Sequence, residues 1–121
     1  MIKKVFVSGS SKGIGLSIAK KLLDEGNEVV INGRNRKKIL SLCKKFNFTG
    51  AVAGDLSNNN GAKKVIKNTI KILGRLDVLI CNAGESKSCK PNTENYKDWI
   101  KMFNQNFFTT SNLIENSKKY L

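Results

Sequence analysis

The most informative absence in this 121-residue chain is histidine, which does not occur at all. The chain alone therefore cannot build a Ser-His-Asp triad, a Cys-His nucleophile pair or a histidine metal site. Cysteine is scarce, and Cys43, Cys81 and Cys89 are odd in number and lack the paired spacing of metal-binding motifs. We expect neither a disulfide framework nor a metal site, and reduced thiols are typical of a cytoplasmic protein.

Long apolar runs are also missing. No stretch of about 18 apolar residues occurs, so the sequence predicts no membrane span and no membrane partner. The apolar run near the N-terminus is short and leads directly into a glycine-rich turn, which is typical of a strand and not of a signal peptide. We therefore expect a cytoplasmic location. With 40% hydrophobic residues, positions 1–121 are enough for one domain with a buried core.

Acidic residues are few, since 9 Asp and Glu stand against 22 Lys and Arg and the formal net charge is +13. A charge of this size attracts polyanions to a protein surface. However, only three of the basic residues are arginines, and no basic stripe alternates with aromatic residues as in proteins that bind single strands. Solvated lysine faces are the simpler interpretation, so the sequence predicts no nucleic-acid partner.

The chain does contain a regular alternation of strand-like and helix-like segments. Strands are expected at 2–7, 28–31, 48–53 and 77–81, and helices at 14–25, 36–46, 58–73 and about 93–119. Short, nearly continuous apolar strands that alternate with helices indicate a parallel sheet covered on both faces. Right-handed crossovers then predict a doubly wound, Rossmann-like α/β fold of about four strands in the order 3-2-1-4.

A glycine-rich turn, SGSSKGIG at residues 8–15, joins the first expected strand to the first expected helix. Backbone N–H groups at such a turn point outward, the helix dipole favours negative charge, and missing side chains let a pyrophosphate approach. An ordinary tight turn is the alternative, but the strand before it and the helix after it favour a dinucleotide site. The predicted cofactor contacts of this turn are Gly9, Ser11, Lys12, Gly13, Ile14 and Gly15.

The end of the second expected strand favours NADP over NAD as the cofactor. An NAD site places a carboxylate roughly 20 residues beyond the glycines, where it binds the ribose 2′-hydroxyl. No carboxylate lies between Glu28 and Asp55, and Arg34 instead offers a guanidinium that suits a 2′-phosphate. Lys12 adds a second positive charge. Each cation alone has a simpler interpretation as a solvated surface group, but together with the missing acid they predict NADP.

Two more strand ends bring residues to the same edge of the predicted sheet. Asp55 follows the third strand and either accepts a hydrogen bond from an adenine amino group or caps a turn or helix together with Ser57. Asn82, Ala83 and Gly84 follow the fourth strand, beside the first, where ligands bind in such sheets. Their small side chains let a cofactor lie against the backbone, and Asn82 is expected to pair with backbone groups of neighbouring strands.

The last expected helix has an unusually aromatic face. Trp99, Met102, Phe103 and Phe107 follow the i, i+3, i+4 and i+8 spacing of one side of a helix. Packing against the sheet is the first interpretation of this face, and a subunit interface in a homo-oligomer is the second. Both interpretations fit a long helix whose parts have different neighbours.

Together these segments resemble the short-chain dehydrogenase/reductase family in its single-domain, NADP-preferring form. The resemblance implies a Rossmann-like fold and an oxidoreductase that transfers a hydride between NADP(H) and a small carbonyl or alcohol compound. It also implies that Asp55 and Leu56 contact adenine. Four collinear motifs carry it: residues 8–15 for TGxxxGIG, Asp55-Leu56 for D-[VL], residues 76–84 for LDxLVNNAG, and Trp99 with Asn106 seven residues later for W-(x)6-N.

The chain departs from the family pattern at two of these positions. Ser8 stands where threonine is usual, which keeps the hydroxyl group. Cys81 stands where the first asparagine of NNAG is usual, and we expect this to weaken one hydrogen bond to the glycine turn.

A third departure concerns catalysis, for which the resemblance implies an Asn, a Ser, a Tyr and a Lys. The tyrosine acts as acid/base with a pKa lowered by the lysine, the serine orients the carbonyl, and the asparagine holds a water in a proton relay. Only Asn106 matches, because Tyr96 is followed four residues later by Ile100 and Tyr120 is the penultimate residue. We expect the N-terminal part of such an enzyme, inactive alone; a non-catalytic NADP-binding or regulatory module is the alternative.

Overall fold

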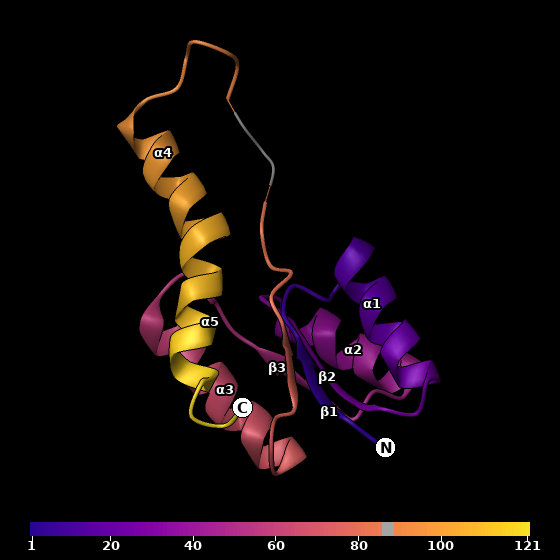
Figure 1. Cartoon of the computed structure of the whole chain (residues 1–121). Coiled ribbons are helices and arrows are strands. Elements are labelled where there is room, and N and C mark those ends of the chain that lie inside the picture. Colours follow the sequence, from indigo (N-terminus) through magenta and orange to yellow (C-terminus); the bar gives the residue numbers. More distant parts are fainter. Residues whose placement is uncertain (86–88) are drawn as a thin grey trace.

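The computed structural model describes residues 1–85 and 89–121 and confirms the predicted sheet (Figure 1). The four parallel strands are β1 (Lys4–Val7), β2 (Glu28–Gly33), β3 (Gly50–Ala53) and β4 (Val78–Ile80). They lie in the order β3-β2-β1-β4, with Phe6 of β1 opposite Val30 of β2 and Leu79 of β4. The two crossover directions therefore diverge at β1, which places a crevice above the carboxyl ends of β1 and β4.

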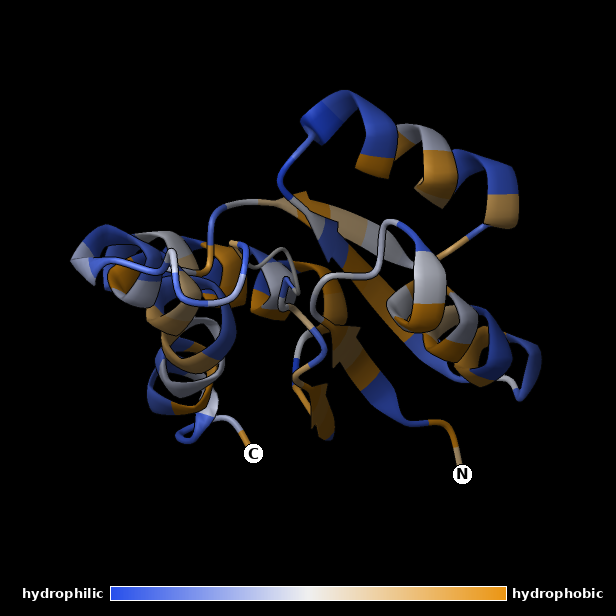
Figure 2. Ribbon diagram, turned by 90° about the horizontal axis from the view of Figure 1, so that it is seen from above, coloured by the Kyte–Doolittle hydropathy of each residue, from blue (hydrophilic) through white to orange (hydrophobic). Residues whose placement is uncertain are grey.

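Helices cover both faces of the sheet, as predicted (Figure 2). The helical segments are α1 (Gly13–Asp24), α2 (Arg36–Phe46), α3 (Asn59–Leu73), α4 (Tyr96–Phe103), the π-helical turn η1 (Asn104–Phe108) and α5 (Thr109–Ser117). Alternate residues of β1 separate two cores, since Val5 and Val7 pack on the side of α1 and α2 while Phe6 packs with α3 and with Leu113 of α5. No helix within the described residues has the length and apolar character needed to cross a membrane.

The last helix differs from the prediction. Residues 96–117 form α4, η1 and α5 in place of one regular α-helix, and α4 projects beyond the sheet (Figure 1). Trp99, Phe103 and Phe107, hereafter the aromatic face, are 58%, 50% and 57% exposed. Met102, the fourth residue of the predicted face, is half-buried. The interpretation that the three aromatic residues pack on the sheet is therefore wrong, because α4 extends past the layer that α3 and α5 form on the strands.

Candidate cofactor-binding cleft

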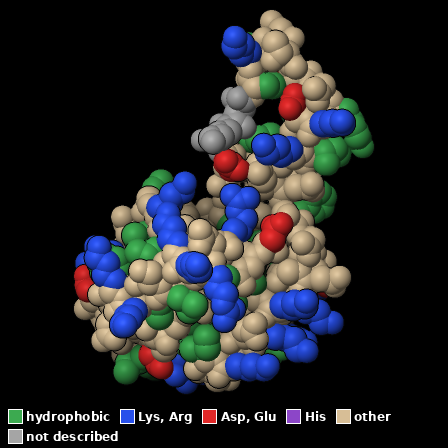
Figure 3. Space-filling view, turned by 180° about the vertical axis from the view of Figure 1, so that it is seen from behind, with side chains coloured by type: hydrophobic (Ala, Val, Ile, Leu, Met, Phe, Trp, Pro, Cys, Tyr) green, Lys and Arg blue, Asp and Glu red, His purple; other side chains and the backbone are tan. Residues whose placement is uncertain are grey.

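A cleft of about 790 Å³ opens at the carboxyl ends of the strands. The segments that follow all four strands line one side of it, and residues of α4 and η1 line the other. Seen from behind, Lys and Arg side chains gather around the hollow between the main body and the projecting part (Figure 3). Every cofactor residue predicted from the sequence lines this cleft except Gly15.

The glycine turn has a backbone that side chains would obstruct. Gly9 and Gly13 adopt the left-handed conformation, with φ of +56° and +58°. A Cβ on Gly9 would lie 2.8 Å from the Cα of Ala83, so the turn packs tightly on the segment after β4. A Cβ on Gly13 would meet nothing within 4 Å, whereas one on Gly15 would collide with the Gly9 carbonyl and the Asn82 amide. Gly13 thus faces open cleft, and Gly15 serves close packing behind it.

Helix α1 begins without a side-chain cap. Its N-cap residue is Lys12, which makes no capping hydrogen bond, and its first turn contains no acidic residue. In contrast, Asn35 and Asn58 cap α2 and α3 by accepting hydrogen bonds from Lys38 and Gly61. The first N–H groups of α1 are thus available to an anion, and the helix dipole favours one at this position. This geometry fits the diphosphate of a dinucleotide.

Hydrogen bonds join the end of β1 to the end of β4 at the base of the cleft. Ser8 Oγ accepts from the backbone N–H groups of Asn82 at 2.9 Å and Ala83 at 3.0 Å. The Asn82 side chain donates to the carbonyl of Gly9 at 3.1 Å. This is the supporting contact that the sequence predicts for Asn82, and it keeps the glycine turn against the segment after β4.

Asn32 is a supporting residue that the sequence analysis missed. Its side chain is 2% exposed, and its Oδ1 accepts from Gly9 N–H at 3.2 Å while its Nδ2 donates to the Val52 carbonyl at 2.9 Å. Its backbone N–H donates to Ser10 Oγ at 2.8 Å. Asn32 therefore ties the glycine turn to β2 and β3. The available signal was an asparagine inside the apolar run of β2, because a buried amide requires partners.

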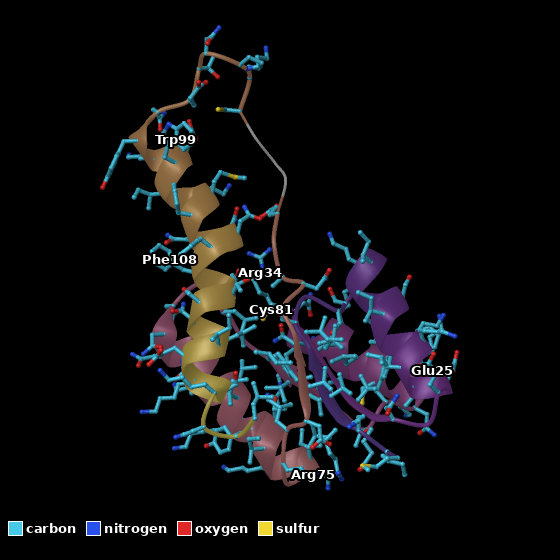
Figure 4. The ribbon with its side chains drawn as sticks, viewed as in Figure 1. Glu25, Arg34, Arg75, Cys81, Trp99 and Phe108 are labelled. Atoms are coloured by element: carbon cyan, nitrogen blue, oxygen red, sulfur yellow. The ribbon has the colours of Figure 1, made fainter. Side chains whose placement is uncertain are left out.

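Arg34 and Asp55 lie on the same side of the cleft, after β2 and β3. Figure 4 shows Arg34 between the strands and the α4–α5 segment. The backbone N–H of Ser57 donates to Asp55 Oδ1 at 2.9 Å, and this bond, the Ser57 hydroxyl and the Arg34 charge hold the pKa of Asp55 below its usual range. The turn interpretation of Asp55 is correct and the helix-cap interpretation is wrong, since Asn58 caps α3. Contact with adenine stays a prediction.

Leu56 is buried at the edge of the cleft, whereas Asn106 is exposed but lies outside the cleft lining. Leu56 lines the cleft but is only 4% exposed and belongs to the core beneath α3. Asn106 lies in η1 outside the lining, where its Nδ2 donates to the carbonyls of Glu85 and Met102 at 2.9 and 3.1 Å. Its Oδ1 accepts from Glu85 N–H at 2.9 Å. The Asn106 amide thus fastens η1 to the segment after β4.

The wall formed by α4 and η1 is the part of the site that the sequence analysis did not find. Its lining residues recur at helical spacing, and two of them are lysines that the sequence places four positions apart. That spacing shows that the two lysines share one side of the helix. The sequence does not show whether this side faces the cleft or the solvent. The residues are Tyr96, Lys97, Ile100, Lys101, Asn104 and Gln105, which Thr109 at the start of α5 adjoins.

Comparison with known proteins gives a consistent result. The family model described as short chain dehydrogenase matches residues 3–121. An uncharacterised oxidoreductase of Staphylococcus epidermidis is 30% identical over 120 residues, which cover 98% of this chain and 52% of that protein. Glucose 1-dehydrogenase of Gluconobacter oxydans is 39% identical over 87 residues, covering 68% of this chain and 33% of that protein. The chain thus spans a third to about half the length of these relatives.

Solved structures match over nearly all of the chain. The Pseudomonas aeruginosa RhlG/NADP active-site complex has a TM-score of 0.90 and 28% identity, covering 97% of this chain and 47% of that one. A gluconate 5-dehydrogenase from Burkholderia cenocepacia in complex with NADP and tartrate has a TM-score of 0.87 and 25% identity, covering 97% and 48%. Both neighbours are NADP complexes, and both share the fold described above.

Proposed function

Because the chain belongs to the short-chain dehydrogenase family, an oxidoreductase family, we propose that residues 1–121 form a dinucleotide-binding domain for NADP. The proposed reaction is hydride transfer between NADP(H) and a small carbonyl or alcohol compound. The cleft carries the proposal, because the uncapped start of α1 and the cations Lys12 and Arg34 line the same space. When bound, NADP supplies the hydride donor or acceptor, and the protein supplies binding and orientation.

Each end of the proposed cofactor has a matching group in the cleft. The N–H groups at the start of α1 suit the diphosphate, with Gly13 leaving room for its approach. Arg34 suits the 2′-phosphate because its guanidinium offers a planar fork of donors, and Lys12 adds charge. Neither cation forms an ion pair with a carboxylate among the described residues. Both therefore keep their charge available to a ligand.

Calorimetric titration with 2′-phospho-ADP-ribose and with ADP-ribose tests this proposal on the chain as it stands. Charge-assisted hydrogen bonds contribute about 1.5–3 kcal/mol, so the 2′-phosphorylated compound should bind roughly 10- to 100-fold more tightly. Arg34→Gln should reduce this ratio toward one. Arg36→Gln is the matched control, because Arg36 lies in α2 and does not line the cleft. Equal affinity for both compounds, or no binding of either, would refute NADP as the cofactor.

We propose that these 121 residues bind the cofactor without turning over substrate. The support is in the sequence, which contains Asn106 but no tyrosine followed four positions later by lysine. In the described structure the Asn106 side chain already holds the backbone of Glu85, so a relay water would have to use the second lone pair of Oδ1 or the backbone carbonyl. The coding sequence downstream of Leu121 is the direct test, and a long open frame without Tyr-xxx-Lys would contradict the enzyme proposal.

A non-catalytic NADP-binding or regulatory module is the second candidate. It rests on the same cleft, and it predicts tight cofactor binding without any downstream catalytic pair.

The cytoplasm is the proposed location, on the argument that Cys43, Cys81 and Cys89 are all free thiols in the structure.

A further inference from the structure

Helix α4 presents two lysines to the cleft, whereas no residue of the aromatic face lines it. Lys97 and Lys101 line the cleft together with Ile100 and Asn104, which follow helical spacing along one side of the segment. Trp99, which Figure 4 labels on the projecting part of α4, is not among the residues that line the cleft. The two lysines thus reach the cleft from α4, whereas the glycine turn and Arg34 belong to the segments that follow β1 and β2.

The position of Lys97 does not stabilise the helix that carries it. Lys97 lies in the first turn of α4, just after the cap residue Asn95, where the helix dipole disfavours positive charge. Lys101 follows four residues later in the last turn of α4, and like charges at this spacing repel each other. The nearby carboxylate of Asp98 accepts from the backbone N–H of Asn95 at 2.9 Å, as part of the cap of α4. Neither lysine forms an ion pair with any carboxylate in residues 1–85 and 89–121.

The cleft as a whole has more positive than negative charge. Glu85 and Asp55 are its carboxylates, and Asp55 already accepts the Ser57 N–H. The cofactor groups proposed above use the start of α1, Lys12 and Arg34. The two lysines of α4 therefore remain as cations to which no anion has been assigned. They lie on the helical segment that continues into η1, which contains Asn106.

We propose that Lys97 and Lys101 form a second anion subsite in the cleft, which binds a phosphate or carboxylate group. This inference rests on the proposed function, because the subsite borders the space assigned to NADP. The anion has two possible sources, an acidic group on the substrate or the 2′-phosphate of the cofactor. Because Arg34 and Lys12 are already assigned to the 2′-phosphate, the substrate is the favoured source of the anion. The predicted substrate is therefore a carbonyl or alcohol compound that bears a carboxylate or phosphate.

The test compares the double variant Lys97→Gln/Lys101→Gln with the control Lys63→Gln/Lys67→Gln. The control lysines are also four residues apart and exposed, but they lie on α3 and do not line the cleft. Inorganic phosphate is titrated into the NADP-saturated chain at constant ionic strength, and amide NMR shifts report binding. In a second arm, 2′-phospho-ADP-ribose and ADP-ribose are titrated by calorimetry. Circular dichroism establishes that both double variants are folded.

If the anion belongs to the substrate, the α4 variant should raise the dissociation constant of phosphate about fivefold or more, because it loses two partly exposed ion pairs. The ratio of the two nucleotide affinities should then stay unchanged. A cofactor source predicts that this ratio falls instead. The inference is overturned if the α4 variant matches the control in both arms. Failure of the unmodified chain to bind either nucleotide would refute the proposed function. The lysine pair would still be tested in that case, by titrating phosphate into the chain without NADP.

Discussion

Replacement of Ser8 by alanine tests the joint between β1 and β4 on which the cleft depends. Ser8 is fully buried, and its hydroxyl oxygen accepts two backbone N–H groups, those of Asn82 and Ala83. Alanine removes the acceptor without adding atoms. Both N–H groups then lose their partner in a half-buried environment.

The magnitude follows from the cost of unsatisfied donors. A buried N–H without a partner costs about 1–3 kcal/mol. Asn82 and Ala83 are half-buried, so water satisfies part of their demand and the lower half of that range applies to each. Ser8→Ala should therefore lower the free energy of unfolding by about 2–4 kcal/mol. With a urea dependence of about 2 kcal/mol per molar, the middle of the usual range, the unfolding midpoint should fall by about 1–2 M.

Urea unfolding followed by far-ultraviolet circular dichroism measures this shift. Ser41→Ala is the matched control, because Ser41 is exposed on α2 and alanine there favours the helix. The folded fraction of Ser8→Ala should also bind 2′-phospho-ADP-ribose more weakly, since the segment after β4 loses its anchor. A midpoint equal to that of the control would refute the argument that the Ser8 hydroxyl holds this joint.

Three further outcomes are expected. Gly15→Ala should destabilise the chain more than Gly13→Ala in thermal unfolding, because a Cβ at position 15 meets the backbone of the glycine turn. A Cβ at position 13 adds only the strain of a left-handed residue, about 1–2 kcal/mol. The reverse order would contradict the packing described. The lowered pKa of Asp55 means that its ionised form adds stability at neutral pH that is lost as pH falls through that pKa, so the unfolding free energy of Asp55→Asn should change less on acidification than that of the unmodified chain. We also expect two copies to associate through the aromatic face, so light scattering should show a concentration-dependent mass that Phe103→Lys abolishes, and a constant monomer mass in the unmodified chain would exclude this interface.

The sheet and the glycine turn were predictable because local rules determine them. Apolar runs of strand length, helical spacing and the right-handed crossover leave few arrangements for four strands, and β3-β2-β1-β4 is the one observed. The turn was readable for the same reason, since a strand must end and a helix must begin around Gly9 and Gly13. Both features depend on residues close together in the chain.

Features that depend on distant neighbours were less accessible. Helical spacing predicted that Trp99, Phe103 and Phe107 share a face, but the choice between the sheet and solvent depends on how far α4 extends past α3. Asp55, Ser57 and Asn58 are all capping residue types, and only the backbone path after β3 selects Asn58. The π-helical turn likewise accompanies tertiary contacts, among them those of Asn106 with Glu85.

The two sides of the cleft also differ in how they should respond to salt. The start of α1 offers backbone N–H groups at short range, whereas Arg34 and Lys12 offer exposed charges whose attraction salt screens. The screening length falls from about 10 Å at 0.1 M to about 3 Å at 1 M ionic strength. The affinity for 2′-phospho-ADP-ribose should therefore fall more steeply with salt than the affinity for ADP-ribose, which lacks the 2′-phosphate. Calorimetric titration across that range measures both slopes, and parallel slopes would show that the 2′-phosphate is not held by these cations.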